Sequence, residues 1–495
     1  MRESGILMHI TSLPGAYGIG TMGKAAFDFV DFLEKAGQRC WQILPLNPTG
    51  YGDSPYQSCS TFAGNHYLID LDELMAEGLL ESNEVLSVNW GQQDGRVDYG
   101  TLYENRLAVL RIAYGRFPGS EDFDRFCREN GSWLSDFALF MALKEKNGGS
   151  SWYTWEDPLK LRQPEAIWQA RQELKGQIRF YSFVQYLFFQ QWKRLRDYAH
   201  GKHIRIIGDV PIYVPYDSAD VWSNPELFQL DERLNPSMVA GVPPDGFTED
   251  GQLWGNPLYR WDLLQQDGYS WWIRRLEAAA ALYDVIRLDH FRGFESYWAV
   301  PYGDETARNG RWVKGPGLDF VETVKEKLPQ IKLIAEDLGF LTPEVLQLRH
   351  DSGFPGMKVL EFAFDSREPS DYLPHTYCHN AVCYTGTHDN MTCRQWFDTA
   401  PAEAVAYAAE YMRLTEAEGY VWGMIRTAFS SAADLCVIQM QDYLDLGSEA
   451  RMKYPGTLSA NNWTWRAERD YANDDLAEKI YHMTKLYCRL GNELN

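Results

Sequence analysis

The sequence lacks three features that mark large classes of proteins: long apolar runs, an excess of basic residues and paired cysteines. No stretch approaches the 18 or more apolar residues of a membrane-spanning helix, so we expect no membrane span. The formal net charge of −22 argues against nucleic acids and anionic membrane surfaces as partners, because both demand a basic footprint. These absences leave a globular chain of 495 residues, of which 45% are hydrophobic and 23% are charged.

Signatures of cofactors and metals are missing as well. The chain contains no P-loop, HExxH or GxSxG motif. The glycine-rich element GIGTMG (Gly18–Gly23) lacks the spacing of a dinucleotide-binding loop, and we interpret it as a turn. The eight cysteines are scattered without the spacing of zinc ligands. We therefore expect that the protein needs no metal and no cofactor.

Cysteine usage and the N-terminus favour a cytoplasmic location. Cysteines without CxxC pairs are typical of free thiols in a reducing compartment. The apolar run at residues 5–10 is too short for the core of a signal peptide. We therefore expect a cytoplasmic protein.

Eight short segments of β-branched and apolar residues recur along the chain, and most are followed by polar or glycine- and proline-rich loops. They are Ile6–Ile10, Cys40–Pro45, Ile204–Asp209, Val285–Asp289, Leu333–Asp337, Lys358–Phe362, Val382–Thr385 and Leu435–Gln439. Helical patterns lie between several of them, at Ala25–Ala36 and Trp272–Ala281 for example. This alternation predicts an α/β fold, a (β/α)₈ TIM barrel with inserted subdomains around its C-terminal mouth. A doubly wound open sheet is the alternative.

The uneven spacing of these strands predicts two insertions. Residues 46–203 separate the second and third strands, far more than one crossover needs. Apolar residues recur there at helical intervals: Trp133, Phe137, Phe140 and Met141, then Val184, Phe188, Trp192 and Leu195. We predict the first two barrel strands in residues 1–74, a mainly helical insertion at 75–190, the third strand in 191–209, a loop-rich insertion over the active site at 210–265, and the rest of the barrel at 266–495.

Three of the apolar segments run into a carboxylate. Asp289 ends DVIRLDH before its histidine, Glu336 follows IKLIA, and Asp389 follows VCYTGTH. The carboxyl ends of parallel barrel strands meet at one mouth, where barrel enzymes keep their chemistry. We therefore expect the three carboxylates to converge and to support acid/base or glycosyl-transfer chemistry.

These carboxylates need different electrostatics for such chemistry. Arg287 lies two residues before Asp289 on a strand, hence on the same face, and is predicted to lower the pKa of that carboxyl. Glu336 needs a raised pKa to donate a proton at neutral pH, which a neighbouring anion such as Asp337 or burial among Leu333, Ile334 and Leu338 would supply. Asp389 would accept hydrogen bonds from substrate hydroxyls. Helix capping and a structural ion pair remain open as alternative explanations.

The aromatic content suits a saccharide ligand. The chain has 18 tryptophans and 29 tyrosines, whose flat apolar faces and polar tips fit sugar rings. Most of them are expected in the core, and Tyr56 and Trp254, in loops, are better candidates for binding. An acidic surface is compatible with a neutral substrate of this kind.

Longer motifs run through nearly the whole chain. They are SLPGAYGIG (Ser12–Gly20), WQILPLNPTGYGDSPYQ (Trp41–Gln57), GDVPIYV (Gly208–Val214), GVPPDGF (Gly241–Phe247), LWGNPLY (Leu253–Tyr259), IRLDHFRGF (Ile286–Phe294), AEDLG (Ala335–Gly339), YTGTHDN (Tyr384–Asn390) and NWTWR (Asn462–Arg466). Together they make the chain similar to the 4-α-glucanotransferases of the amylomaltase, or disproportionating enzyme, family, which are relatives of the α-amylases.

The resemblance implies a role for each matching residue. Asp289 is similar to the family nucleophile that forms a β-glucosyl ester, Glu336 resembles the general acid/base, and Asp389 resembles the residue that binds the 2- and 3-hydroxyls of the transferred ring. The residues implied to bind the glucan are Ser54, Tyr56, Asp209, Asp245, Gln252, Trp254, Arg287, His290, His388 and Asn462.

The reaction implied by the resemblance is a retaining transfer of an α-1,4-glucan segment to the 4-hydroxyl of another glucan or of glucose. Malto-oligosaccharides, amylose or other α-1,4-glucans are the expected partners, and the oligomeric state is left open. The residues alone do not separate transfer from hydrolysis, because both use the same two carboxylates. An α-amylase-like hydrolase and a non-catalytic glucan-binding barrel are the alternatives. His66 and Met391 depart from the family pattern without touching the three carboxylates.

Overall fold

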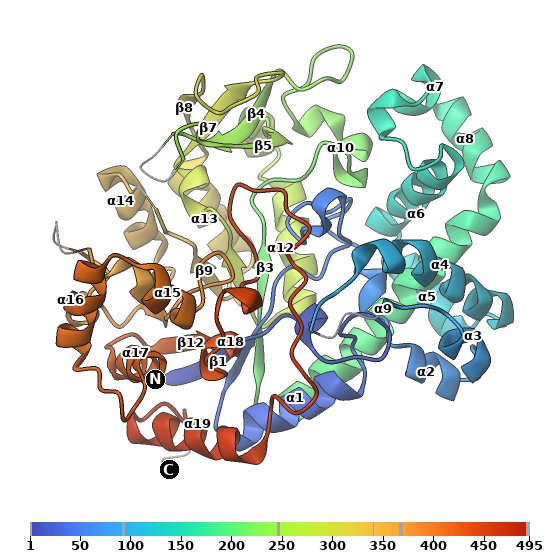
Figure 1. The fold of residues 1–495 in the computed structure, drawn as a ribbon. Coiled ribbons are helices and arrows are strands. Elements are labelled where there is room, and N and C mark those ends of the chain that lie inside the picture. The colour runs from blue at the N-terminus through green and yellow to red at the C-terminus, as the bar shows by residue number, and fades with distance from the viewer. Residues whose placement is uncertain (1, 92–94, 245–247, 340, 366–369, 492–495) are drawn as a thin grey trace.

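Eight parallel strands form a barrel in the computed structural model, which describes residues 2–91, 95–244, 248–339, 341–365 and 370–491 (Figure 1). The strands are β1 (Glu3–Leu7), β2 (Cys40–Gln42), β3 (Arg205–Val210), β6 (Val285–Leu288), β9 (Leu333–Ala335), β10 (Gly356–Val359), β11 (Ala381–Tyr384) and β12 (Leu435–Gln439). Each overlaps one of the predicted segments, and the predicted barrel is confirmed. Every residue of β2, β6, β9 and β11 is buried, which explains why these strands are mostly apolar.

The barrel closes between β9 and β10. The sheet runs in the order β10-β11-β12-β1-β2-β3-β6-β9, so its neighbours follow the order of the chain. Across the seam the Ala335 amide donates to the Pro355 carbonyl at 2.9 Å. The Met357 amide donates to Asp337 Oδ1 at 2.7 Å, so a side-chain carboxylate serves as an acceptor at the closing edge.

Helices surround the barrel on its outer face (Figure 1). They are α1 (Lys24–Lys35), α12 (Ser270–Leu282), α13 (Gly317–Lys327), α14 (Pro343–Ser352), α15 (Cys393–Thr399), α16 (Ala402–Met412), α17 (Tyr420–Ser430) and α19 (Asp474–Leu486). The short helix α18 (Met440–Tyr443) directly follows β12, at the carboxyl end of that strand. α1 and α12 confirm the two helices predicted above. α1 buries Phe29, Val30 and Leu33 along one face. Across the described ranges, no helix combines the length and the apolar character needed to cross a membrane.

A group of helices lies beside the barrel, at the right of Figure 1. It consists of α2 (Leu71–Ala76), α3 (Ser82–Leu86), α4 (Tyr99–Arg116), α5 (Glu121–Glu129), α6 (Gly131–Lys146), α7 (Asp157–Lys160), α8 (Pro164–Glu173) and α9 (Lys175–Gly201). The predicted helical stripe Val184, Phe188, Trp192 and Leu195 is buried on α9. The boundary predicted at residue 190 falls inside α9, which continues from the helical group to β3. The division of the chain into segments remains a prediction.

A second, antiparallel sheet lies near the mouth of the barrel (Figure 1). Its order is β5 (Gln252–Pro257), β4 (Met238–Val242), β7 (Ser296–Pro301) and β8 (Arg311–Lys314). Residues 210–265, predicted to be loop-rich, thus contain two strands, together with α10 (Ala219–Ser223) and α11 (Trp261–Gln266). Glycine and proline interrupt these two strands, which pair with each other, and β7, the other partner of β4, lies beyond residue 265. The sequence therefore shows no clear strand pattern there.

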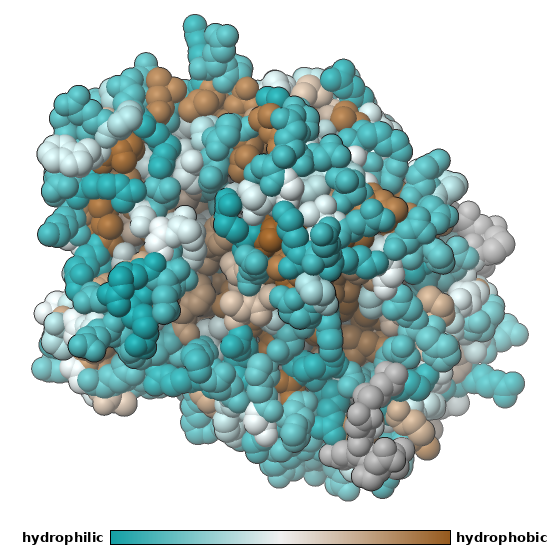
Figure 2. Space-filling model, turned by 180° about the vertical axis from the view of Figure 1, so that it is seen from behind, coloured by the Kyte–Doolittle hydropathy of each residue, from teal (hydrophilic) through white to brown (hydrophobic). Residues whose placement is uncertain are grey.

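Figure 2 shows the face of the molecule opposite to Figure 1. Hydrophilic residues dominate it, and apolar residues gather mainly in recesses between hydrophilic ridges.

The seam carboxylate provides a test of the fold. Burial raises the pKa of Asp337 to about 6, and the Met357 amide opposes that rise. Asp337→Ala leaves the Met357 amide without its acceptor and should lower the free energy of unfolding by about 1–3 kcal/mol. Denaturant titration at neutral pH measures the change. Asp337→Asn keeps an acceptor oxygen and should cost less. Equal stability of the two variants would contradict a role for this bond in closing the barrel.

Candidate functional site

The three predicted carboxylates gather at the carboxyl ends of the barrel strands. Asp289 and Glu336 directly follow β6 and β9, and Asp389 lies in the loop after β11. Main-chain bonds fix the first two: the Asp289 amide donates to the Val210 carbonyl at 3.1 Å, and the Glu336 amide donates to the Leu288 carbonyl at 3.0 Å. The side chains of Asp289 and Asp389 are 24% and 34% exposed, so a ligand can reach them.

Arg287 is the buried cation at the centre of the site. Its Nη1 donates to Asp209 Oδ2 at 2.6 Å and to Asp289 Oδ1 at 3.0 Å. Arg287 and Asp209 are each 1% exposed. Tyr56 Oη donates to the same Asp209 oxygen at 2.7 Å. One guanidinium therefore joins carboxylates from two neighbouring strands, β3 and β6.

The net pKa shift of Asp289 differs from the prediction. Burial is the largest influence on the pKa of Asp289 and raises it, and the nearby Asp389 raises it as well. Arg287 lowers this pKa, as expected, but by less, so the net shift is upward. The pKa of Asp209 rises to about 6 because burial and Asp289 outweigh Arg287 and the Tyr56 hydrogen bond. The neighbouring cation is visible in the sequence, whereas the cost of burying the Asp289 carboxylate depends on the fold around it.

Glu336 has the raised pKa that the sequence argument required. Burial and the charge of Asp289 raise its pKa to about 8, against the opposing effect of Arg287 and two main-chain amides. These amides belong to His290, at 2.7 Å from Oε2, and Leu338, at 3.0 Å from Oε1. Asp337 is instead engaged at the barrel seam. Glu336 therefore carries a proton at neutral pH and can donate it.

Asp389 is held in the opposite state. Burial raises its pKa, but His388, Lys453 and Arg287 outweigh burial and bring the pKa well below its usual range. Lys453 Nζ lies 2.5 Å from Asp389 Oδ1, and His388 Nε2 lies 3.3 Å from Oδ2. Burial lowers the pKa of His388 itself to about 3, so the imidazole is neutral near pH 7. Lys453 and Arg287 are therefore the cations that keep Asp389 ionised.

The loop that carries Asp389 is fixed by its own side chains. Asn390 Oδ1 accepts from the amide of Thr387 at 2.9 Å and from its hydroxyl at 2.9 Å, which shapes a tight turn. Thr385 Oγ1 donates to the buried Asp442 at 2.6 Å, and Gln439 Nε2 donates to the Met391 carbonyl at 3.1 Å. Local sequence thus sets the turn, and residues at the end of β12 and in α18 hold it in place.

Aromatic side chains line the approach to the carboxylates. Tyr56 stacks on His388, with ring centroids 5.2 Å apart and planes 11° apart. Ser54 Oγ accepts from the Tyr56 amide at 3.2 Å and so supports the turn before the ring. Trp254 meets the His290 ring edge to face at 4.8 Å, and its Nε1 donates to Gln252 Oε1 at 3.2 Å. Asp245, the remaining predicted residue of this stretch, lies outside the described residues.

Asn462 has a different environment from the one its predicted role suggests. Its Nδ2 donates to the Thr457 carbonyl at 3.0 Å, and its Oδ1 accepts from the Tyr454 amide at 3.0 Å. The side chain is 6% exposed. Both ends of the amide are thus engaged in holding the loop between residues 454 and 462.

Sequence reasoning missed Lys453, Arg451 and Trp463. Lys453 Nζ lies 5.1 Å from the centroid of the Trp463 ring, and Arg451 Nη2 donates to the Asp389 carbonyl at 3.3 Å. Arg451 and Lys453 stand in a polar segment without a recognisable chemical pattern, whereas Trp463 lies in the motif NWTWR, of which only Asn462 was assigned a role. For the cations, the signal in the sequence was the balance of charges expected at the site. Several carboxylates expected at one buried site, with one arginine nearby, require a further cation.

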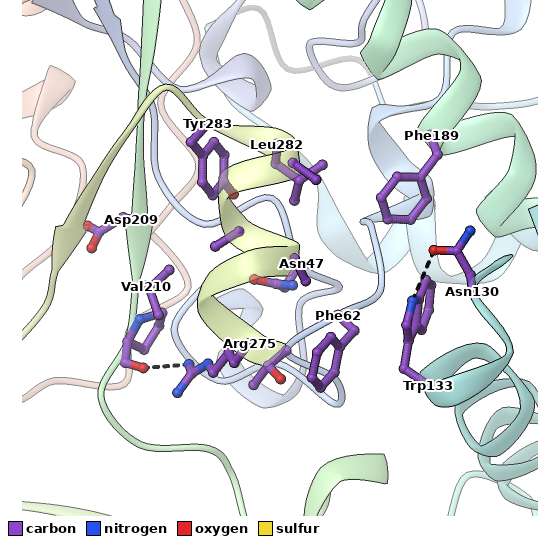
Figure 3. Close-up of a pocket in the computed structure, with 15 residues that line it drawn as sticks. Asn47, Phe62, Asn130, Trp133, Phe189, Asp209, Val210, Arg275, Leu282 and Tyr283 are labelled. Carbon is purple, nitrogen blue, oxygen red and sulfur yellow. Dashed lines mark hydrogen bonds between the residues drawn. The ribbon is translucent and has the colours of Figure 1, made fainter. Parts of the chain in front are cut away.

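A hollow behind β3 is not the substrate site. Its volume is about 70 Å³, room for a few water molecules and too little for a sugar ring. It lies between α12 and the helical group, with Trp133 and Phe189 on one side and Leu282 on the other (Figure 3). In this view the Asp209 side chain points away from the hollow. Within the described residues, no group of three or more His, Cys, Asp and Glu side chains is arranged to hold a metal ion.

Comparisons with known proteins agree with this arrangement. A family model described as 4-alpha-glucanotransferase matches residues 8–471. The 4-alpha-glucanotransferase of Clostridium butyricum is 51% identical over 486 residues, which cover 97% of this chain and 100% of that protein. That of Thermus thermophilus is 49% identical over 478 residues, covering 94% of each. A solved amylomaltase from Streptococcus agalactiae, in complex with acarbose, superposes with a TM-score of 0.96 at 42% identity and covers 99% of this chain and 100% of its own.

The raised pKa of Glu336 predicts how stability depends on pH. The pKa is about 8 in the folded chain and about 4.3 in the unfolded one. The folded chain binds more protons between these values, so its stability falls as pH rises from about 4 to about 8. The glutamine of Glu336→Gln does not titrate. The free energy of unfolding of this variant, relative to that of the wild type, should therefore rise by about 1–3 kcal/mol between about pH 5 and pH 8. Thermal unfolding of both proteins at the two pH values measures this.

Glu84→Gln is the control for this comparison. Arg116 lowers the pKa of Glu84 to about 2, so Glu84 titrates below the tested range. Its difference from the wild type should stay constant between the two pH values. A constant difference for Glu336→Gln as well would show that Glu336 is not protonated in the folded chain.

Proposed function

The chain belongs to the 4-alpha-glucanotransferase family, and we propose that it moves α-1,4-glucan segments between malto-oligosaccharides through a covalent glucosyl ester on Asp289. It is an enzyme of the amylomaltase type. The proposal specifies the intermediate, the donors and the acceptors. Malto-oligosaccharides or amylose are the donors, and the 4-hydroxyl of a second glucan or of glucose is the acceptor.

The observation that carries the mechanism is the contrast between two carboxyl groups at the same barrel mouth. Glu336 has a pKa of about 8 and holds a proton at neutral pH, whereas the pKa of Asp389 is held well below its usual range. Environments that separate the pKa values of paired carboxyl groups assign acid and base roles. Asp289, in contact with Arg287 at 3.0 Å, is the third of the predicted carboxylates, and its partly exposed side chain is suited to attack carbon, unlike the buried Asp209.

The reaction then takes two displacements. Asp289 attacks C1 of the donor sugar while Glu336 gives its proton to the departing glycosidic oxygen, so one C–O bond forms and another breaks. The ionised Glu336 next takes a proton from the acceptor 4-hydroxyl, which attacks C1 and releases Asp289. Two inversions retain the α configuration. Asp389 accepts hydrogen bonds from hydroxyls of the transferred ring.

Transfer requires that a sugar hydroxyl compete successfully with water. Gln252 and Trp254 lie on one face of β5, and Trp254 packs against His290, whose amide binds Glu336. We assign these side chains to the acceptor side, where they would position a second glucan close to the proton acceptor. Tyr56 and His388 would support the donor ring. The solved relative from Streptococcus agalactiae is in complex with acarbose, which supports a saccharide ligand for this chain.

Incubation of the purified protein with maltotriose tests the function. We expect glucose together with maltopentaose and longer chains, at a constant number of reducing ends, because each transfer makes one bond for each bond broken. Separation of the products by chromatography and a reducing-end assay measure both quantities. A rising number of reducing ends without longer chains would identify a hydrolase, and unchanged maltotriose would indicate a non-catalytic barrel.

The nucleophile assignment has its own test. Asp289→Asn removes the attacking carboxylate and should lower the transfer rate by a factor on the order of 10⁴ or more, with maltotriose binding largely retained. Asp284→Asn is the matched control. Asp284 stands immediately before β6, at the opposite end of the same strand, where its Oδ2 accepts from the Ile206 amide at 2.7 Å. Normal transfer by Asp289→Asn would overturn the assignment.

A further inference from the structure

We propose that Lys453 is a positioning residue for the transfer reaction, which holds Asp389 ionised and aimed at the hydroxyls of the transferred sugar. The inference rests on the proposed function, since it concerns the same site. Lys453 belongs to none of the strand-end motifs and comes from the segment between α18 and α19, drawn orange to red in front of the barrel in Figure 1.

The position of the Lys453 ammonium is closely defined. Nζ lies 2.5 Å from Asp389 Oδ1, 5.5 Å from the centroid of the Tyr56 ring and 5.1 Å from that of Trp463. The side chain is 21% exposed. Aromatic rings attract a cation, and partial removal from water strengthens its attraction to a carboxylate. Lys453 is thus held among two rings and one anion.

The segment that carries Lys453 also grips the main chain of Asp389. Arg451 Nη2 donates to the Asp389 carbonyl at 3.3 Å, and Arg451 Nε donates to the Lys453 carbonyl at 2.8 Å. The Trp463 amide donates to the Met452 carbonyl at 2.7 Å, which closes the segment on itself. The C-terminal part of the chain therefore holds Asp389 at both its side chain and its carbonyl.

The charge balance of the site explains why Asp389 needs a cation of its own. Charged and titratable groups face it from the loop after β2, from β6 and its end, from the loop after β11 and from the C-terminal segment. They are Tyr56, Arg287, Asp289, His388, Arg451 and Lys453.

Of these groups, Lys453 is the cation that touches the Asp389 carboxylate. Arg287 is already shared by two other carboxylates, Asp209 and Asp289, and His388 is neutral near pH 7. Asp289 and Asp389 repel each other, and each raises the cost of ionising its neighbour. Without Lys453, this pair would take up a proton at a higher pH. A protonated Asp389 loses its charge-assisted hydrogen bonds to sugar hydroxyls.

The pH dependence of transfer in Lys453 variants tests this inference. In Lys453→Met the acid limb of kcat/KM should move up by about one pH unit or more, and kcat/KM at neutral pH should fall by a factor of about 10 to 100. Lys453→Arg keeps the charge and should leave the limb near its wild-type position. Lys453→Gln provides the same neutral comparison if the methionine variant does not fold.

Lys144→Met is the matched control. Lys144 Nζ lies 2.5 Å from Asp217 Oδ2, with side chains 20% and 30% exposed, against 21% and 34% for Lys453 and Asp389. Its pair joins α6 to the loop before α10, away from the three carboxylates, so its pH profile should match the wild type. An unmoved acid limb in Lys453→Met or Lys453→Gln would overturn the inference. An equal loss of kcat/KM in Lys453→Arg would also overturn it, because a variant that keeps the charge would then fail like the neutral ones, and the segment would have only a structural role.

Failure of the proposed function would give a different result. If the wild-type protein makes no glucans longer than maltotriose, the transfer reaction is contradicted. The ionisation of Asp389 can then be followed through the binding of maltotriose. In that case, as the pH is lowered, the dissociation constant of maltotriose should begin to rise at a higher pH in Lys453→Met than in the wild type. Identical binding profiles would overturn the role of Lys453.

Discussion

Arg287 is a cation buried to 1% exposure, and its charge must be balanced inside the barrel. Asp209 and Asp289 supply that balance through the same guanidinium nitrogen, and Tyr56 donates to the Asp209 oxygen that Arg287 also binds. Because these groups come from β3, from β6 and from the loop after β2, the ion pairs fix three parts of the mouth relative to one another. The placement of Asp289, and of everything that faces it, depends on this cluster.

Around this cluster, position alone gives similar side chains different properties. Glu336 accepts two main-chain hydrogen bonds and still has a pKa of about 8, because burial and Asp289 outweigh them. Asp389 lies at the same mouth and stays ionised, because Lys453 contacts it directly. A proton donor and an anion at one mouth are what the cleavage of a glycosidic bond requires. The chemistry therefore follows from how charge is distributed around the barrel mouth.

Parts of the chain far from the strand-end motifs complete the site. β5 of the second sheet carries Gln252 and Trp254, and the segment after α18 carries Arg451 and Lys453. Neither part contributes a strand to the barrel. A barrel with short parallel strands provides the carboxylates, and the insertions and the C-terminal segment add rings and charges around them. This division agrees with the general behaviour of barrel enzymes, whose loops vary over a constant core.

The eight barrel strands could be predicted from the sequence, because strands buried on both faces are rich in apolar residues. It also placed Asp289, Glu336 and Asp389 at the carboxyl ends of such runs, and its longer motifs pointed to the family. The net pKa of Asp289, the cation on Asp389 and the strands β4, β5, β7 and β8 were decided by the tertiary structure alone. Burial and pairing between residues 64 positions apart, as for Asp389 and Lys453, depend on the whole fold. No local pattern records them.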